Sequence, residues 1–348
     1  MRKWERVIPA VLALCMMTGC GMSQKDDSVF RVSMVAGTGG INDQSFNQSA
    51  WEGLQSLKEH TGADVRVLES KQTADYLTNL DRATDTYSDL IWGIGYDQAD
   101  ALATIAKMNP DISFAIVDTT YEECPHNISG VTFRAEESSF LVGYIAGMST
   151  VTDKVGYVGP MKSFNNDLFQ YGYLAGVAYA SRVRGVQVEV QQQFAESYSD
   201  AAKAKAIANK MYTSGCDIIF HSAGGAGYGV IESAKENGAF VIGVDTDQSY
   251  LAPENVLTSA MKNVNIAVEL LSTMAMDGEK IGGKTFSYGL AEGCVGIPKE
   301  NPNMSPEVYE EAMKIQKMII DGKLIPPATE DAYETFLAEL KGVVSSNL

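Results

Sequence analysis

The chain has 348 residues, of which 45% are apolar and 20% are charged. This size and balance suit a globular protein with two domains and a sizeable core. The formal net charge of −17 argues against a nucleic-acid partner, because binding phosphates needs clustered cations.

The N-terminus has the pattern of a lipoprotein signal peptide. A few basic residues precede an apolar run at 7–17, and Cys20 follows two small residues. The run is too short for a spanning helix, which needs roughly 20 apolar residues. We therefore expect residues 1–19 to be removed, Cys20 to carry a lipid that anchors the protein to the outside of the cell membrane, and residues 20–29 to form a linker. An uncleaved anchor or a plain secretory signal is the alternative.

Three further cysteines, Cys124, Cys216 and Cys294, lie beyond this segment and show no Cys-x-x-Cys spacing. A zinc or redox motif is therefore not indicated. One disulfide and one free thiol are compatible with the composition, and the spacing does not choose a pair. We expect no metal and no cofactor.

From residue 30 onward, short apolar runs alternate with helical patterns. The first half predicts strands at 30–36, 63–68, 90–94, 113–117 and 128–133, with helices at 45–60, 76–88 and 96–108. The second half predicts helices at 138–150, 166–182, 201–214, 227–237 and 266–278. Its strands are expected at 154–158, 187–193, 217–220, 240–244 and 256–261, followed by an apolar run at 285–297.

This βαβ alternation predicts an α/β fold of two doubly wound parallel-sheet lobes, joined by a multi-stranded hinge with a cleft between them. We expect lobe 1 to comprise 30–130 and 256–281. Lobe 2 is expected to comprise 131–255 and 282–325, and 326–348 is expected to form a C-terminal tail.

Ligands in such sheets bind outside the carboxyl ends of the strands. Asp118 and Asp245 each follow a buried apolar run, and Asn42 and Asp43 follow the first strand. Carboxylates at these positions can accept hydrogen bonds from hydroxyl or ring N–H groups. For Asp43 the local pattern leaves two interpretations open, a helix cap or a ligand contact.

The glycine-dense segment 220–229, which includes Gly225, follows a strand and opens a helix, but it matches neither phosphate-binding motif. Aromatic residues near the strand ends, Phe220 with Trp51 or Phe46, could stack on a planar ring. By spacing alone each of these aromatic residues is also a candidate core residue. Lys262 follows a short extended segment, and a single lysine at such a position is expected to be solvated.

Five collinear segments resemble the basic membrane protein family, the substrate-binding lipoproteins of nucleoside ABC transporters. They are GTGGINDQSFNQSAWEGL, SFLVGYIAG, IIFHSAGGAGYGVIESAKE, VIGVDTDQ and VLTSAMKNV. The resemblance implies a type I periplasmic-binding-protein fold that closes on a purine nucleoside. It places Trp51 and Phe220 on the two faces of the base, with Phe46 as the alternative to Trp51.

The resemblance also implies polar contacts to both parts of the nucleoside. The base would contact Asn42, Asp43 and Asp118. The ribose would contact Asp245, Lys262 and Gly225 or its neighbours. Segment 159–166 departs from the family pattern, which leaves contacts from nearby Phe169 open.

The expected function is therefore extracytoplasmic capture of a purine nucleoside, such as inosine, guanosine or adenosine, and its delivery to an ABC permease and ATPase. A ligand sensor for a signalling partner and a sugar receptor are the alternatives within the binding class. A hydrolase using Asp43 and Asp245 as an acid/base pair is disfavoured, because no activated nucleophile is present. The nucleoside expectation depends on Trp51 and Phe220 facing a shared cleft.

Overall fold

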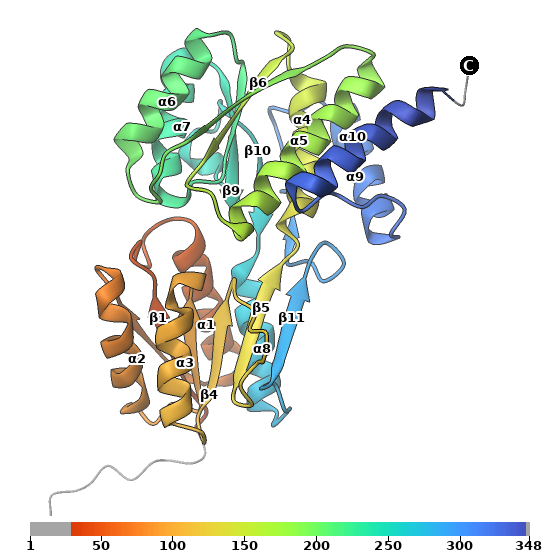
Figure 1. Ribbon diagram of the computed structural model, residues 1–348. Helices are drawn as coiled ribbons and strands as arrows, with labels where there is room; N and C mark the ends of the chain where they lie inside the picture. Colours follow the sequence, from red (N-terminus) through yellow and green to blue (C-terminus); the bar gives the residue numbers. More distant parts are fainter. Residues whose placement is uncertain (1–28, 346–348) are drawn as a thin grey trace, which may run out of the picture.

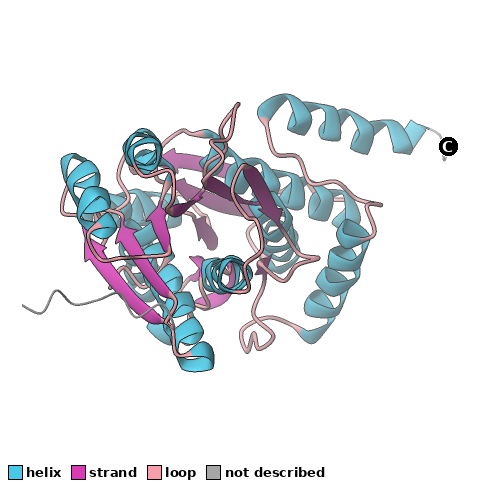
Figure 2. Cartoon of the chain, turned by 90° about the horizontal axis from the view of Figure 1, so that it is seen from below, coloured by secondary structure: helices cyan, strands magenta, loops and turns pink. Residues whose placement is uncertain are grey.

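The computed structural model describes residues 29–345. The predicted signal peptide, Cys20 and nearly all of the predicted linker lie outside the described residues. Two α/β lobes are stacked with a waist between them (Figure 1). Each lobe has a six-stranded sheet, and helices lie on both sides of the strands (Figure 2).

The sheet of lobe 1 has the strand order β11-β5-β4-β3-β1-β2, and all its neighbouring strands are parallel. Its strands are β1 (Arg31–Ala36), β2 (Asp64–Glu69), β3 (Leu90–Ile94), β4 (Ser113–Val117), β5 (Ile128–Phe133) and β11 (Lys284–Tyr288). One face is covered by the packed pair α1 (Phe46–Thr61) and α8 (Val264–Met276), and α2 (Tyr76–Thr84) packs on α3 (Ala99–Met108). Every residue of β3 is buried, as expected for a central parallel strand covered on both faces.

The sheet of lobe 2 has the order β12-β10-β9-β8-β6-β7. Its strands are β6 (Lys154–Gly159), β7 (Glu189–Phe194), β8 (Ile218–His221), β9 (Phe240–Asp245), β10 (Val256–Lys262) and the short antiparallel β12 (Val295–Gly296). Its helices are α4 (Ala135–Ser149), α5 (Phe164–Arg184), α6 (Ala201–Thr213), α7 (Gly227–Asn237), α9 (Pro306–Ile320) and α10 (Glu330–Ser345).

The chain crosses between the lobes after β5, after β10 and after β11, which confirms the predicted multi-stranded hinge. The crossings are tied to one another by side chains and backbone. Arg134, after β5, donates to Glu137 and to Glu292, both at 2.7 Å. The amide of Asn263, after β10, donates to the Cys294 carbonyl at 2.8 Å. The hinge is therefore one cross-linked unit.

The predicted lobe boundaries need correction in three places. Strand β10 belongs to lobe 2, where it pairs with β9, and β11 belongs to lobe 1, where it pairs with β5. The sequence pattern identifies 256–261 as extended and 285–297 as an apolar run, but it carries no information about the partner strand. The predicted tail contains α10, which packs on lobe 2 through ring contacts such as Phe140 with Phe336. Neither α9 nor α10 was predicted as a helix from the sequence.

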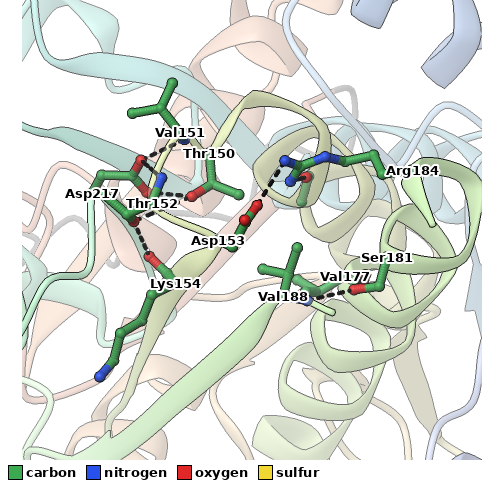
Figure 3. A network of polar contacts seen from close by, with 11 residues as sticks. Thr150, Val151, Thr152, Asp153, Lys154, Val177, Ser181, Arg184, Val188 and Asp217 are labelled. Atoms are coloured by element: carbon green, nitrogen blue, oxygen red, sulfur yellow. Dashed lines mark hydrogen bonds and ion pairs between the residues drawn. The ribbon is translucent and has the colours of Figure 1, made fainter. Parts of the chain in front are cut away.

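A polar network fixes the end of lobe 2 that lies away from the waist (Figure 3). Asp217, just before β8, accepts hydrogen bonds from the Thr150 hydroxyl at 2.7 Å and from the amide of Val151 at 2.7 Å. Arg184 at the end of α5 pairs with Asp153 at 2.7 Å. These contacts tie the turn between α4 and β6 to the amino end of the sheet, opposite the carboxyl ends.

Within residues 29–345, no helix combines the length and apolar content needed to cross a bilayer. The thiols of Cys124, Cys216 and Cys294 are all free, so no disulfide forms among these three.

Candidate ligand-binding site

A cavity of about 270 Å³ lies between the lobes, at the carboxyl ends of both sheets. The residues that line it end or follow β1, β2, β3 and β4 in lobe 1, and β6, β7, β8, β9 and β10 in lobe 2. Its size is near the lower end of the range for small-molecule sites, roughly 300–1,000 Å³. The strand-end rule therefore identifies the correct edge of each sheet.

An ion pair joins the lobes inside this cavity. Lys262, the last residue of β10, lies 2.7 and 2.6 Å from the two carboxylate oxygens of Asp118, which follows β4. Lys262 is only 4% exposed, which corrects the expectation from its sequence alone that it is solvated. A buried ammonium needs such a partner, because removing an ion from water is costly.

Aromatic rings also surround the Lys262 ammonium. Its Nζ lies 4.7 Å from the ring centroid of Phe46, 5.0 Å from that of Phe133 and 6.0 Å from that of Phe169. Such cation–π contacts favour a charged, desolvated amine. Phe46 belongs to lobe 1 and Phe169 to α5 of lobe 2, and both line the cavity. The ammonium therefore contacts rings from both lobes, and two of these rings line the same cavity.

Asp245, the last residue of β9, is buried and lines the cavity. The hydroxyl of Ser45, in lobe 1, donates to its carboxylate across the lobe interface. Burial raises the pKa of Asp245 to about 6, and the nearby Lys262 charge and the Ser45 hydrogen bond partly oppose this rise. The carboxylate is therefore ionised at neutral pH and becomes protonated in mild acid.

Asp43 lines the cavity and also caps α1, so the two interpretations are compatible. Its Oδ1 accepts from the amides of Ser45 and Gln48, both at 3.0 Å. Its Oδ2 accepts from the amide and from the side-chain Nδ2 of Asn47, both at 2.9 Å. All these donors come from the start of α1, so the Asp43 carboxylate is already engaged within its own lobe.

Gly225 lines the cavity within the 3₁₀ turn η3 (Gly224–Ala226), just before α7. The Ala226 amide donates to the Tyr198 carbonyl at 2.9 Å, which fixes this loop to the segment after β7. Tyr228, in the first turn of α7, also lines the cavity, and its buried hydroxyl finds no hydrogen-bond partner within the described residues. An unpartnered buried hydroxyl is costly, so a ligand group that bonded to it would be favoured.

Three predicted site residues lie elsewhere. Trp51 packs against the core of its lobe and does not line the cavity. Phe220 is fully buried in lobe 2, with its ring centroid 5.7 Å from that of Tyr157 and 5.1 Å from that of Tyr173. Asn42 is exposed and also lies off the cavity. The predicted pair of facing rings, Trp51 and Phe220, is therefore wrong.

Phe46 lines the cavity where Trp51 was expected, as the alternative assignment proposed. The prediction also missed several polar and aromatic residues that line the cavity: Thr38, Asn47, Tyr76, Asp97, Asn165, Asn166, Tyr198 and Tyr228. Most of them lie in loops that follow strands or in the first turn of the next helix, so proximity to a strand end was the available signal.

Further contacts between the lobes hold the cleft closed. The Tyr250 hydroxyl of lobe 2 donates to Gln44 Oε1 of lobe 1 at 2.7 Å. Asn165, at the start of α5, donates to the Asp118 carbonyl at 3.0 Å. The observed conformation is therefore a closed one, stabilised by direct contacts between the lobes.

Comparison with known proteins places this architecture in a family. Residues 30–330 match the family described as ABC transporter substrate-binding protein PnrA-like. The chain is 41% identical to Basic membrane protein A of Borreliella afzelii, over 92% of this chain and 98% of that protein. It is 38% identical to the CD4+ T-cell-stimulating antigen of Listeria monocytogenes, over 94% of this chain and 98% of that protein.

Solved structures agree with this assignment. An ABC transporter solute-binding protein from Aeropyrum pernix is similar with a TM-score of 0.79 and 25% identity, over 90% of this chain and 98% of that one. A transcriptional activator of the comK gene from Bacillus halodurans, at TM-score 0.73 and 22% identity over 86% and 100% of the two chains, shares the fold. The sequence matches, the two-lobed fold and the cavity between the lobes together show that this chain belongs to the PnrA-like family of ABC transporter substrate-binding proteins.

Proposed function

We propose that this chain is the lipid-anchored receptor of an ABC importer and that it captures a purine nucleoside between its lobes. The family is one of substrate-binding proteins rather than enzymes, and it implies a permease and an ATPase as partners. The observation that carries the nucleoside proposal is the cavity itself. Rings from both lobes line it together with carboxylates and an ammonium at the strand ends.

The rings suit a flat heterocycle. Phe46 approaches from lobe 1, and Phe169 and Tyr228 approach from lobe 2. Stacking of a base on an aromatic side chain contributes about 1–3 kcal/mol. With Trp51 and Phe220 both outside the cavity, Phe46 takes the role of the first ring, and the second ring comes from α5 or α7.

The polar groups suit the hydroxyls of a pentose. The Asp245 carboxylate accepts hydrogen bonds, and Lys262 retains one N–H donor beyond the two that point at Asp118. Four carboxylates line the cavity, those of Asp43, Asp97, Asp118 and Asp245. Lys262 is the single lysine or arginine among the described lining residues, so a phosphorylated ligand would be repelled and a neutral nucleoside is favoured.

Capture follows from hinge closure. A ligand that touches both lobes stabilises the closed state relative to the open one, and only this difference in affinity shifts the population. The direct contacts between Tyr250 and Gln44 and between Lys262 and Asp118 already favour closure. The bound nucleoside adds its own contacts to both lobes.

Calorimetry tests this proposal on protein that has been unfolded and refolded to remove any ligand acquired during expression. Inosine, guanosine and adenosine are titrated beside guanosine monophosphate, ribose and glucose. We expect binding of at least one nucleoside and none of the monophosphate. Binding of a sugar alone would identify a sugar receptor and overturn the proposal.

Two aromatic variants on the same helix sharpen the test. Phe46→Ala should weaken nucleoside binding by about 1–3 kcal/mol, because a stacking face is lost. Trp51→Ala removes a ring of the same helix that lies outside the cavity, so it should leave the affinity unchanged. Equal losses in the two variants would contradict the assignment of Phe46.

The lipid anchor is tested separately. Cys20→Ser should release the protein from the membrane fraction without changing its nucleoside affinity. Retention of this variant in membranes would contradict anchoring through Cys20.

A further inference from the structure

Asp97 is a lining residue whose role the proposed function leaves open. It lies in the 3₁₀ turn η2 (Tyr96–Gln98) directly after β3 and lines the cavity. The hydroxyl of Tyr76, a residue that is 2% exposed, donates to Asp97 Oδ2 at 2.6 Å. One oxygen of the carboxylate is therefore fixed by the first residue of α2.

The other oxygen and the edge of the Phe46 ring both lie close to Gly95. Gly95 adopts a left-handed φ of 115°, and an ideal Cβ built on it would lie 2.8 Å from Asp97 Oδ1 and 3.9 Å from Phe46 Cε1. A side chain at position 95 would clash with Asp97 Oδ1, so glycine lets that oxygen and the edge of the ring lie near each other beside the cavity. A heterocycle stacked on Phe46 can place its own edge against that oxygen.

The neighbouring carboxylate of Asp43 is already engaged. Each of its oxygens accepts two hydrogen bonds from residues at the start of α1. Asp97 Oδ1 accepts no hydrogen bond from the described residues. Asp97 Oδ1 is therefore an acceptor beside the cavity that a ligand can use.

We propose that Asp97 recognises the hydrogen-bonding edge of the purine and favours guanine; this inference rests on the proposed nucleoside function. A carboxylate only accepts hydrogen bonds. Guanine offers two adjacent donors on its pairing edge, the ring N1–H and the 2-amino group. Hypoxanthine offers one, and adenine presents an acceptor at the same ring nitrogen, which the carboxylate repels. The expected order of affinity is guanosine, then inosine, then adenosine.

The position of Asp97 sets the size of the effect. Asp97 is exposed as well as lining the cavity, so water competes for its oxygens. The expected preference is therefore near the lower end of what a well-placed bidentate pair supplies, about tenfold.

The test is calorimetry with guanosine, inosine and adenosine on the refolded protein, on Asp97→Asn and on Asp100→Asn. Asp100 is an exposed acid one turn further along that does not line the cavity, so it controls for the loss of one negative charge. We expect the parent and Asp100→Asn to prefer guanosine over adenosine by about tenfold, and Asp97→Asn to reduce that preference to about twofold or less. Circular dichroism checks that each variant is folded.

The outcomes separate two failures. Nucleoside binding with no preference for guanosine, or an equal loss for all three nucleosides in Asp97→Asn, overturns the role of Asp97 and leaves the proposed function standing. Absence of binding to any nucleoside by the parent protein overturns the proposed function and this inference with it. As a second variant, Tyr76→Phe frees Oδ2 and should lower the preference less than Asp97→Asn does.

Discussion

Each lobe has an aspartate at an equivalent position of its sheet, but the two aspartates have different partners. Strands β4 and β9 are each third from the same edge in the two sheet orders, and they lead to Asp118 and end at Asp245, respectively. Both residues have left-handed backbones, with φ of 65° and 64°. Asp tolerates this conformation better than most residues with a side chain do. The same backbone turn thus aims a carboxylate into the cavity from each lobe.

The partners of the two carboxylates differ. Asp118 meets the Lys262 ammonium, whereas Asp245 is buried, meets the Ser45 hydroxyl and has no direct cation among residues 29–345. Both partners come from the opposite lobe. We infer that the pair at Asp118 organises the closed cavity, while Asp245 retains the acceptor capacity and the raised pKa that make it responsive to ligand and to pH.

The largest expected effect is a loss of folding stability when the Lys262 ammonium is removed. Lys262→Met leaves the Asp118 carboxylate, whose side chain is only 11% exposed, without its counter-charge, and breaking a buried pair from one side costs about 3–5 kcal/mol of unfolding free energy. Urea unfolding measures this loss. Lys205→Met, which breaks a surface pair with Glu236, should cost about 1 kcal/mol or less. Similar losses in the two variants would show that the Lys262 pair behaves as a surface pair.

The next largest effect is a loss of nucleoside affinity when the charge of Asp245, in lobe 2, is removed. Asp245→Asn keeps the side-chain shape and tolerates the left-handed backbone, but it removes the charge. We expect nucleoside binding at neutral pH to weaken by about 1.5–3 kcal/mol, as for loss of a charge-assisted hydrogen bond. Calorimetry measures the change, and an unaltered affinity would exclude Asp245 from ligand binding.

The shared backbone conformation makes a prediction for both sites. Asp→Ala and Asp→Gly remove the same carboxylate, but alanine pays about 1–2 kcal/mol for the left-handed conformation and glycine does not. At Asp118 and at Asp245 alike, the glycine variant should therefore be the more stable in urea unfolding. If alanine were equal to glycine at either site, that backbone would not be held in this conformation.

The pH dependence of stability and of binding should also distinguish the two sites. Burial raises the pKa of Asp245 from 3.8 to about 6, with Lys262, Asp43 and Asp118 as charged neighbours. The folded state therefore binds this proton more tightly than the unfolded chain does. The resulting stabilisation is present below pH 4 and is lost as the pH rises through 6.

Ligand affinity should change with pH in the opposite direction, because protonation below pH 6 removes the ionised acceptor. The affinity should fall several-fold between pH 7 and pH 5 in the parent and less in Asp245→Asn. Calorimetry at several pH values measures this. A profile that is the same in the parent and in the variant would assign the titration to another group.

The strand-end rule could predict four of the lining residues from the sequence, Asp43, Asp118, Gly225 and Asp245, whereas Lys262 was expected there only from the family resemblance. The rule works because parallel strands bring their carboxyl ends to one edge, whatever the packing of individual side chains. The alternation of elements predicts the two sheets for the same reason. Partner strands, such as that of β11, depend on long-range pairing, about which local periodicity carries no information.

The aromatic residues show where local reasoning fails. Phe46 and Trp51 are five residues apart on α1, which places them on different faces of the helix at 3.6 residues per turn. Phe220 lies near the end of β8, but its side chain points to the packed face beside Tyr157 and Tyr173. Sequence spacing indicates which residues are near the cleft, whereas the direction of each side chain depends on the packed fold.

A crystal structure of the refolded protein with a bound purine nucleoside tests the central claim most directly. We predict that the heterocycle stacks on Phe46 between the lobes, with the pentose hydroxyls within hydrogen-bond distance of Asp245 and Lys262. A nucleoside found outside this cavity, or a heterocycle without contact to Phe46, would contradict the account.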